Sequence, residues 1–356
     1  MKIDQELSER VGVLRFPLIV GVVFVHAYGA EVGFASRSVG KQESSYVVDF
    51  VFDFISQGVA RISVPVLFLI AGYFFFIGFS FDAYKDKLRS RVRSLLLPFL
   101  IWNVFVLFLL FLGQEVSVTS SFFSGKNAHV SEYNIFEYIN ATLGIDRSPA
   151  AYQFWFIRDL MILVIISPVM YIFLNLAPKS SVVFLFSLWF LDFWLVYVPS
   201  IAAFLFFFLG AYLAKSDTSL FAFDRFGSLF IVTYILVLLV DVLTKGMMIN
   251  EHVHRVGILF GILSVLYLSG FVVKVGWLKR FLLWSGTFSF FVFASHEPLL
   301  TAVKKIIYIM FEPNADLFVI FLYFIIPVFV IVFCIISYLI LKAVAPRFLS
   351  VVSGGR

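Results

Sequence analysis

The chain alternates long apolar runs with shorter polar segments. A transmembrane helix needs about 20 predominantly apolar residues. Runs long enough to cross a bilayer, some only if tilted or extended, lie near residues 13–30, 58–79, 95–113, 155–177, 181–198, 200–214, 229–244, 256–273, 286–311 and 317–343. The pattern predicts an all-α, polytopic integral membrane protein with about ten transmembrane helices in a single domain, residues 1–356. Val198, Pro199 and Ser200 are expected to join the fifth and sixth runs by a tight turn.

Composition supports a membrane protein and excludes several other classes. Hydrophobic residues make up 62% of the chain and charged residues 14%, whereas soluble proteins are about 25% charged. The net charge of +5 fits basic cytoplasmic loops, and no soluble basic domain is present to bind nucleic acid. Cys334 is the single cysteine, which excludes a disulfide framework and a thiolate metal cluster. The polar N-terminus is unlike a cleavable signal peptide, so we expect the first span to stay in place.

The distribution of Lys and Arg predicts the orientation. The segment after the second run is the most basic, and the loops on its side of the membrane carry more Lys and Arg than the opposite loops. Lys304 and Lys305, late in the ninth run, count against this trend. By the positive-inside rule both termini are cytoplasmic. The two long outer loops, residues 31–57 and 114–154, then either shape a site for an acceptor or are plain solvated connections.

Two histidines lie within apolar runs at similar predicted depth. His26 follows Arg15 by eleven residues, or about 16 Å of helix rise. His296 lies about as far into the ninth run, which crosses in the same direction, so the two imidazoles are expected to share a polar cavity. Ionisable groups inside a span are costly and mark functional candidates, although a lone membrane histidine is often a packing residue. Glu297 follows His296 and either orients a histidine, holds a sugar hydroxyl, or faces water at the interface.

Four further residues are candidates for binding a substrate near the outer face. Arg61 opens the second run, and its guanidinium either binds an anion or extends to the interface. Trp155 opens the fourth run and is also typical of an interface aromatic. Arg158 and Asp159 follow it, either as a local ion pair or as residues lining a cavity.

Basic and histidine-rich segments outside the runs allow two more interpretations. The basic loop after the second run could hold the phosphates of a nucleotide-bearing donor, or it could serve topology alone; its candidate donor-binding residues are Lys85, Arg89, Arg91 and Arg93. His252 and His254 lie in an expected outer loop, but no third and fourth ligand is evident, so no metal is expected.

Together these marks resemble the membrane acyltransferase-3 family of bacterial carbohydrate O-acyltransferases, over nearly the whole chain. The marks are Arg15 with His26, Arg61-Ile-Ser-Val-Pro65 running into Ala71-Gly72-Tyr73, Arg91-Val-Arg93 before Leu97-Pro98, Phe154-Trp155-Phe156-Ile-Arg158-Asp159-Leu160, and Ser289 through His296-Glu297-Pro298. Their order and spacing carry the resemblance more than any one of them does.

The resemblance implies acetyl-CoA as cytoplasmic acyl donor and a sugar hydroxyl as acceptor. The acceptor would belong to a surface polysaccharide or its lipid-linked precursor, and the protein would lie in the bacterial cytoplasmic (inner) membrane. We expect His26 to act as general base, with Arg15 binding the donor or fixing the helix. Arg61, Trp155 and His296 would hold the acceptor or the developing oxyanion. The sequence leaves open an acyl-histidine intermediate, the acceptor sugar, the acyl length and the oligomeric state, a homo-oligomer included.

Two other classes of protein fit parts of the same pattern. A secondary transporter of an acyl or sugar compound would also have many spans and buried histidines, but paired broken helices are not evident. A non-catalytic partner of a polysaccharide synthase is the second alternative. Acetyl-CoA turnover that depends on His26 separates the enzyme from both.

Overall fold

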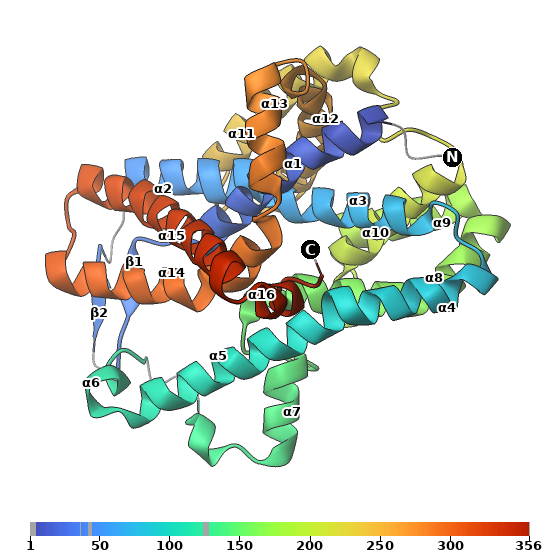
Figure 1. Cartoon of the computed structure of the whole chain (residues 1–356). Helices are drawn as coiled ribbons and strands as arrows, with labels where there is room; N and C mark the ends of the chain where they lie inside the picture. Colours follow the sequence, from blue (N-terminus) through green and yellow to red (C-terminus); the bar gives the residue numbers. More distant parts are fainter. Residues whose placement is uncertain (1–4, 36, 42–44, 124–127, 356) are drawn as a thin grey trace. The chain divides into compact units, whose positions relative to one another are not determined.

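The computed structural model of the protein describes residues 5–35, 37–41, 45–123 and 128–355, and these are almost entirely helical (Figure 1). The chain divides into two compact units. The first contains residues 5–25, 54–92 and 159–289, and the second contains residues 26–53, 93–158 and 290–355. Residues 36, 42–44 and 124–127, in the two loops expected on the outer side, lie outside the described residues.

The first unit is a helical bundle. Its elements are most of α1 (Gln5–His26), most of η1 (Asp53–Val59), η2 (Ala60–Ile62), α3 (Ser63–Phe76), α4 (Phe81–Arg91), most of α8 (Trp155–Leu176), α9 (Pro178–Phe190), α10 (Ile201–Lys215), η6 (Asp224–Phe226), α11 (Gly227–Leu243), α12 (Asn250–Val272) and α13 (Gly276–Gly286).

Two glycines let α3 and α10 pack backbone to backbone. A Cβ at Gly72 of α3 would collide with the backbone of Phe207 in α10, and one at Gly210 would collide with the backbone of Leu69 in α3. Small residues allow this close approach between membrane helices. The glycine pair therefore explains why these two helices run side by side (Figure 1).

A buried arginine links α1 to two other elements of this unit. Arg10 of α1 is 3% exposed. Its guanidinium donates to Ser269 Oγ at 3.0 Å and Leu266 O at 2.7 Å, and it pairs with Asp224 at 2.6 Å. A buried charge requires such partners, so Arg10 joins α1 to α12 and η6.

The second unit contains the remaining elements. They are β1 (Glu31–Gly33), β2 (Ser38–Gly40), α2 (Tyr46–Phe52), most of η3 (Val92–Leu96), α5 (Leu97–Glu115), α6 (Ser117–Ser120), η4 (Val130–Glu132), α7 (Ile135–Leu143), η5 (Tyr152–Phe154), α14 (Ser289–Phe311), α15 (Asp316–Val344) and α16 (Pro346–Val352). The two strands form an antiparallel hairpin with Val32 opposite Val39.

Contacts between distant segments hold the second unit together. Trp102 Nε1 of α5 donates to Val352 O of α16 at 3.1 Å, and these helices lie side by side (Figure 1). The ring of Phe52 in α2 stacks on Tyr323 of α15 at 4.2 Å between centroids. The second unit thus brings together the chain after α1, the segment before α8, and the last three helices.

The predicted class, a helical multi-pass membrane protein, is confirmed. Six helical segments of the described residues are long and apolar enough to cross a membrane: Tyr46–Phe76, Phe81–Glu115, Tyr152–Leu176, Asp224–Leu243, Asn250–Val272 and Asp316–Val344. The apolar helices α9 and α10 are shorter. The count of about ten crossings and the cytoplasmic termini stay predictions.

Several expected loops are helical. Helix continues without a break from Tyr46 to Phe76 and from Phe81 to Glu115, so the basic segment after the second run lies on α4 and η3 instead of in a loop. The side chains of Ser45 and Ser80 cap the N-termini of α2 and α4. Hydropathy locates the apolar part of a helix, and these polar first turns lie outside it.

The fifth run was predicted too long. Helix α9 ends at Phe190, and residues 191–199 are irregular up to Ser200, whose side chain caps α10. Asp192 has φ 56°, a left-handed conformation that does not continue a helix. The connection is therefore longer than the tight turn predicted at residues 198–200.

Candidate functional site

The imidazole of His26 lies between two aromatic groups of the second unit. His26 is the last residue of α1, and the chain leaves the helix directly after it. Its ring centroid lies 5.4 Å from that of His296, with 34° between the planes, and 4.9 Å from that of Tyr152, at 78°. The structure therefore places the two predicted histidines side by side and adds a tyrosine that the sequence analysis did not select.

His296 is fully buried in α14, with 0% of its surface exposed. Its Nδ1 lies 2.8 Å from Phe293 O and 3.1 Å from Val292 O. Because a carbonyl oxygen can only accept, Nδ1 carries the proton and Nε2 carries a lone pair. Nε2 has no hydrogen-bond partner among the described residues. The backbone thus fixes the tautomer and presents a hydrogen-bond acceptor in the interior.

A kink in α14 directly follows His296. Glu297 has φ −107° and ψ 138°, which is extended rather than helical. Pro298 causes this, because its ring disfavours a helical conformation in the preceding residue and it has no N–H to donate to Ala294 O. Gln153 Nε2 donates to Ala294 O at 3.0 Å and to Glu297 O at 3.2 Å. The amide of η5 therefore satisfies the carbonyl that the proline leaves without its helical partner.

The carboxylate of Glu297 belongs to the same cluster. It is 2% exposed, and it accepts a hydrogen bond of 2.9 Å from the hydroxyl of Tyr152 and a longer one, 3.4 Å, from the backbone N–H of Thr301. Tyr152 also contacts the ring of His26. One tyrosine thus connects the carboxylate to the imidazole of His26.

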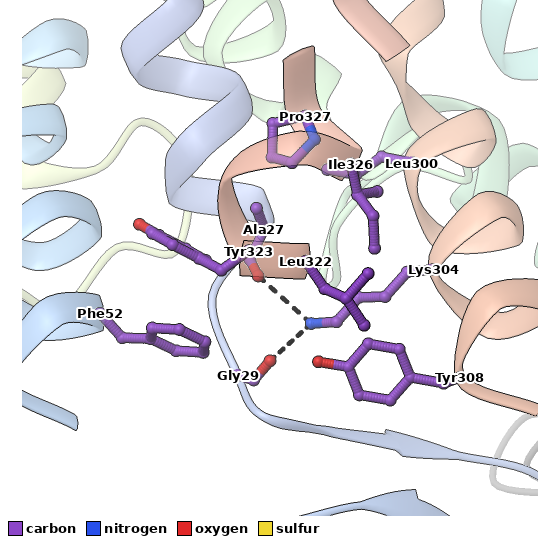
Figure 2. A pocket seen from close by; sticks show the side chains of 10 residues that line it. All are labelled: Ala27, Gly29, Phe52, Leu300, Lys304, Tyr308, Leu322, Tyr323, Ile326 and Pro327. Carbon is purple, nitrogen blue, oxygen red and sulfur yellow. Dashed lines mark hydrogen bonds between the residues drawn. The ribbon is translucent and has the colours of Figure 1, made fainter. Parts of the chain in front are cut away.

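Lys304, on the far side of the kink, contacts the end of α1. Its ammonium donates to Gly29 O at 2.7 Å and to Ala27 O at 3.2 Å, and it lies beside a small cavity (Figure 2). Tyr308, Leu322 and the other labelled side chains line this cavity. The sequence analysis counted Lys304 only as an outward charge, although a cation within an apolar run is itself a signal of a buried role.

Two predicted substrate-binding residues, Trp155 and Arg158, belong to the second unit. The guanidinium of Arg158 binds backbone carbonyls. Its Nη1 donates to the carbonyls of Gly144 and Arg147, the latter at 3.0 Å, which fixes the chain after α7 to the start of α8. Trp155 begins α8 and is half-buried, and Arg93 is exposed in η3. Their use in binding a substrate or donor stays a prediction.

The other predicted residues belong to the first unit. Asp159 is fully buried, and its carboxylate accepts from the backbone N–H of Ser200 at 2.8 Å, at the start of α10. Arg15 and Arg61 are exposed on α1 and η2. The basic residues of α4 are exposed or half-buried: Lys85, Arg89 and Arg91. Their roles likewise stay predictions.

The expected outer-loop position of His252 and His254 is wrong, because α12 begins at Asn250 and both are helical. His254 Nδ1 bonds to the carboxylate of Asp241 at 2.8 Å, and the ring of His252 stacks on Phe190 at 5.0 Å. The described residues contain no group of three or more His, Cys, Asp or Glu side chains that could hold a metal ion.

Comparison with known proteins identifies the family. The acyltransferase-3 family model, an acyltransferase domain, matches residues 9–341 and so includes the whole cluster around His26. The chain belongs to the acyltransferase-3 family. This acyltransferase-3 protein is also similar to the succinoglycan biosynthesis protein ExoH of Rhizobium meliloti (strain 1021), with 23% identity over 369 residues that cover 99% of this chain and 94% of that protein. No solved structure matches the chain.

Proposed function

We propose that the protein transfers an acetyl group from cytoplasmic acetyl-CoA to a sugar hydroxyl of a surface polysaccharide or its lipid-linked precursor, in the bacterial cytoplasmic membrane. The single observation that carries the proposal is the pair of imidazoles, with ring centroids 5.4 Å apart, in the second unit of an acyltransferase-3 protein. The relative named for succinoglycan biosynthesis supports a glycan acceptor. We also propose about ten crossings and cytoplasmic termini.

His26 is the general base in this proposal. It takes the proton of the acceptor hydroxyl as the hydroxyl oxygen attacks the thioester carbonyl carbon. When the carbon–sulfur bond breaks, the proton passes from His26 to the departing sulfur, so one base serves both halves of the transfer. Histidine suits this cycle because its ordinary pKa lies near neutrality.

His296 and Glu297 support the base. In this proposal an imidazolium forms transiently at His26, and the Nε2 lone pair of His296, on the neighbouring ring, accepts a hydrogen bond from it. Backbone carbonyls hold Nδ1 of His296, so this acceptor is fixed before the reaction begins. The carboxylate of Glu297 acts through Tyr152, whose ring lies against His26.

The donor and the acceptor approach from opposite sides in this proposal. When bound, acetyl-CoA supplies the activated acyl group as a thioester. The cations of α4 and η3 complement its phosphates, and Arg15 contributes from α1; the α4 and η3 residues are Lys85, Arg89, Arg91 and Arg93. Arg61, Trp155, Arg158 and Asp159 contribute to acceptor binding.

The test is release of CoA from acetyl-CoA by the purified protein in proteoliposomes, with lipid extract and cell-wall glycans of the host as acceptor source. His26→Ala is compared with wild type, and His252→Ala is the matched control, since that ring only stacks on Phe190. We expect loss of roughly 10²- to 10⁴-fold in His26→Ala, the usual contribution of a general base, and near wild-type release in the control. Equal turnover in His26→Ala and wild type would remove His26 from the mechanism.

A further inference from the structure

We propose that Lys304 is a positioning residue that holds the imidazole of His26 against His296. The inference rests on the function proposed above, because it assigns Lys304 a role in that same site. Helix α1 ends at His26, so the backbone that Lys304 binds lies directly after the reacting imidazole.

The chain directly after α1, which ends at His26, presents the carbonyl oxygens of Ala27 and Gly29 to Lys304. The Lys304 ammonium has three N–H donors and no acceptor, and it donates to Ala27 O at 3.2 Å and Gly29 O at 2.7 Å. A positive charge at a helix C-terminus also interacts favourably with the helix dipole. Lys304 is therefore matched both in hydrogen bonding and in charge to the segment that immediately follows His26.

The same helix that supplies this cation also supplies the partner imidazole. His296 precedes the kink of α14, and Lys304 lies two turns after it. The N-terminal half of α14 thus contacts the ring of His26, while the C-terminal half binds the backbone one to three residues beyond that ring. Gly29 has φ +105°, so the chain turns sharply where Lys304 binds it. Two contacts from one helix therefore hold the ring of His26 in place and fix the direction in which the chain leaves α1.

Lys304 is half-buried in the second unit. The ring of Tyr308 lies 5.6 Å from Nζ of Lys304, and Glu297 lies two turns earlier in the same helix.

The first experiment measures acetyl transfer by Lys304→Met, which keeps the apolar stem and removes the charge and the donors. We expect kcat to fall about 10- to 100-fold, the loss that a displacement of about 1 Å can cause, with the KM for acetyl-CoA unchanged. Lys304→Arg is expected to retain most of kcat. The matched control is Lys305→Met, because the ammonium of Lys305 donates to Phe122 O and not to the segment after α1. This variant is expected to keep the wild-type kcat.

The second experiment uses Lys304→Ala, which lacks a propylammonium fragment. Added propylammonium is expected to restore several-fold of the lost kcat, whereas propanol, of similar size and without charge, is not. If the side chain of Lys304 only filled space, both solutes would restore kcat. Wild-type kcat in Lys304→Met, or equal rescue by propanol and propylammonium, would overturn the positioning role.

A third measurement separates this inference from the proposed function because it needs no turnover. Carbethoxylation of His296, which is 0% exposed, is followed by mass spectrometry. We expect it to be several-fold faster in Lys304→Ala than in wild type and to slow again with propylammonium. If labelling changes in this way but the wild type releases no CoA, the transfer activity is refuted and the positioning role of Lys304 is supported. If the wild type releases CoA but the labelling of His296 in Lys304→Ala equals that in wild type, the positioning role of Lys304 is refuted.

Discussion

Replacing Tyr152 by Phe removes one hydroxyl from the cluster and keeps the ring. The lost hydrogen bond, of 2.9 Å, is donated to the buried carboxylate of Glu297. Hydrogen bonds to charged groups contribute about 1.5–3 kcal/mol, and because Tyr152 is 38% exposed we expect the lower part of that range. A loss of about 1.5–2 kcal/mol shifts the folding equilibrium by roughly 10- to 30-fold.

The assay is reversible unfolding in mixed detergent micelles, followed by tryptophan fluorescence as the fraction of denaturing detergent rises. Tyr138→Phe is the matched control: that side chain is 37% exposed, and its hydroxyl donates to a neutral group, Val130 O, at 2.8 Å. We expect the control to lose about 0.5–1 kcal/mol. If Tyr152→Phe costs no more than Tyr138→Phe, Glu297 is not the charged acceptor that this reasoning requires.

Two further substitutions test other parts of the fold in the same unfolding assay. Arg10→Leu leaves the half-buried carboxylate of Asp224 without its buried partner, so we expect a loss of about 1.5–3 kcal/mol, and a loss below about 1 kcal/mol would contradict the ion pair. Gly40→Ala forces a Cβ against Ala30 O at φ +112°, which we expect to cost about 1–3 kcal/mol. Gly276→Ala, where no atom lies within 4 Å of the added Cβ, is expected to be neutral or stabilising, and equal effects at the two glycines would refute the strain.

The sequence predicts the apolar cores of the helices well and their polar ends poorly. The run at 155–177 matches α8 (Trp155–Leu176), and the run at 317–343 matches α15 (Asp316–Val344). Helix α12 instead begins six residues before the run predicted at 256, because its first turns are polar and hydropathy does not register them. Capping residues such as Ser80 contain that missing information.

The candidate site divides in the same way. The pairing of His26 with His296 was predictable, because equal depth on two helices that cross in one direction allows contact. Tyr152 and Gln153 were not predictable as members of the site, since nothing local shows that η5 packs on the kink of α14. The hydrogen bonds of Lys304 were not predictable for a related reason: a count of charges assigns a lysine to a side of the membrane and does not show what its ammonium binds.

The proline kink of α14 has a consequence for how this chain can be altered or inherited. With any other residue at position 298, the helix would satisfy Ala294 O from its own backbone, and the Gln153 amide would lose that acceptor. With Pro298 kept and Gln153 lost, a carbonyl would be stranded in the interior. Neither position can change first without a cost. The proline and the amide are therefore expected to be kept or lost together among relatives, and a chimaera that imports α14 must import the segment before α8 from the same parent.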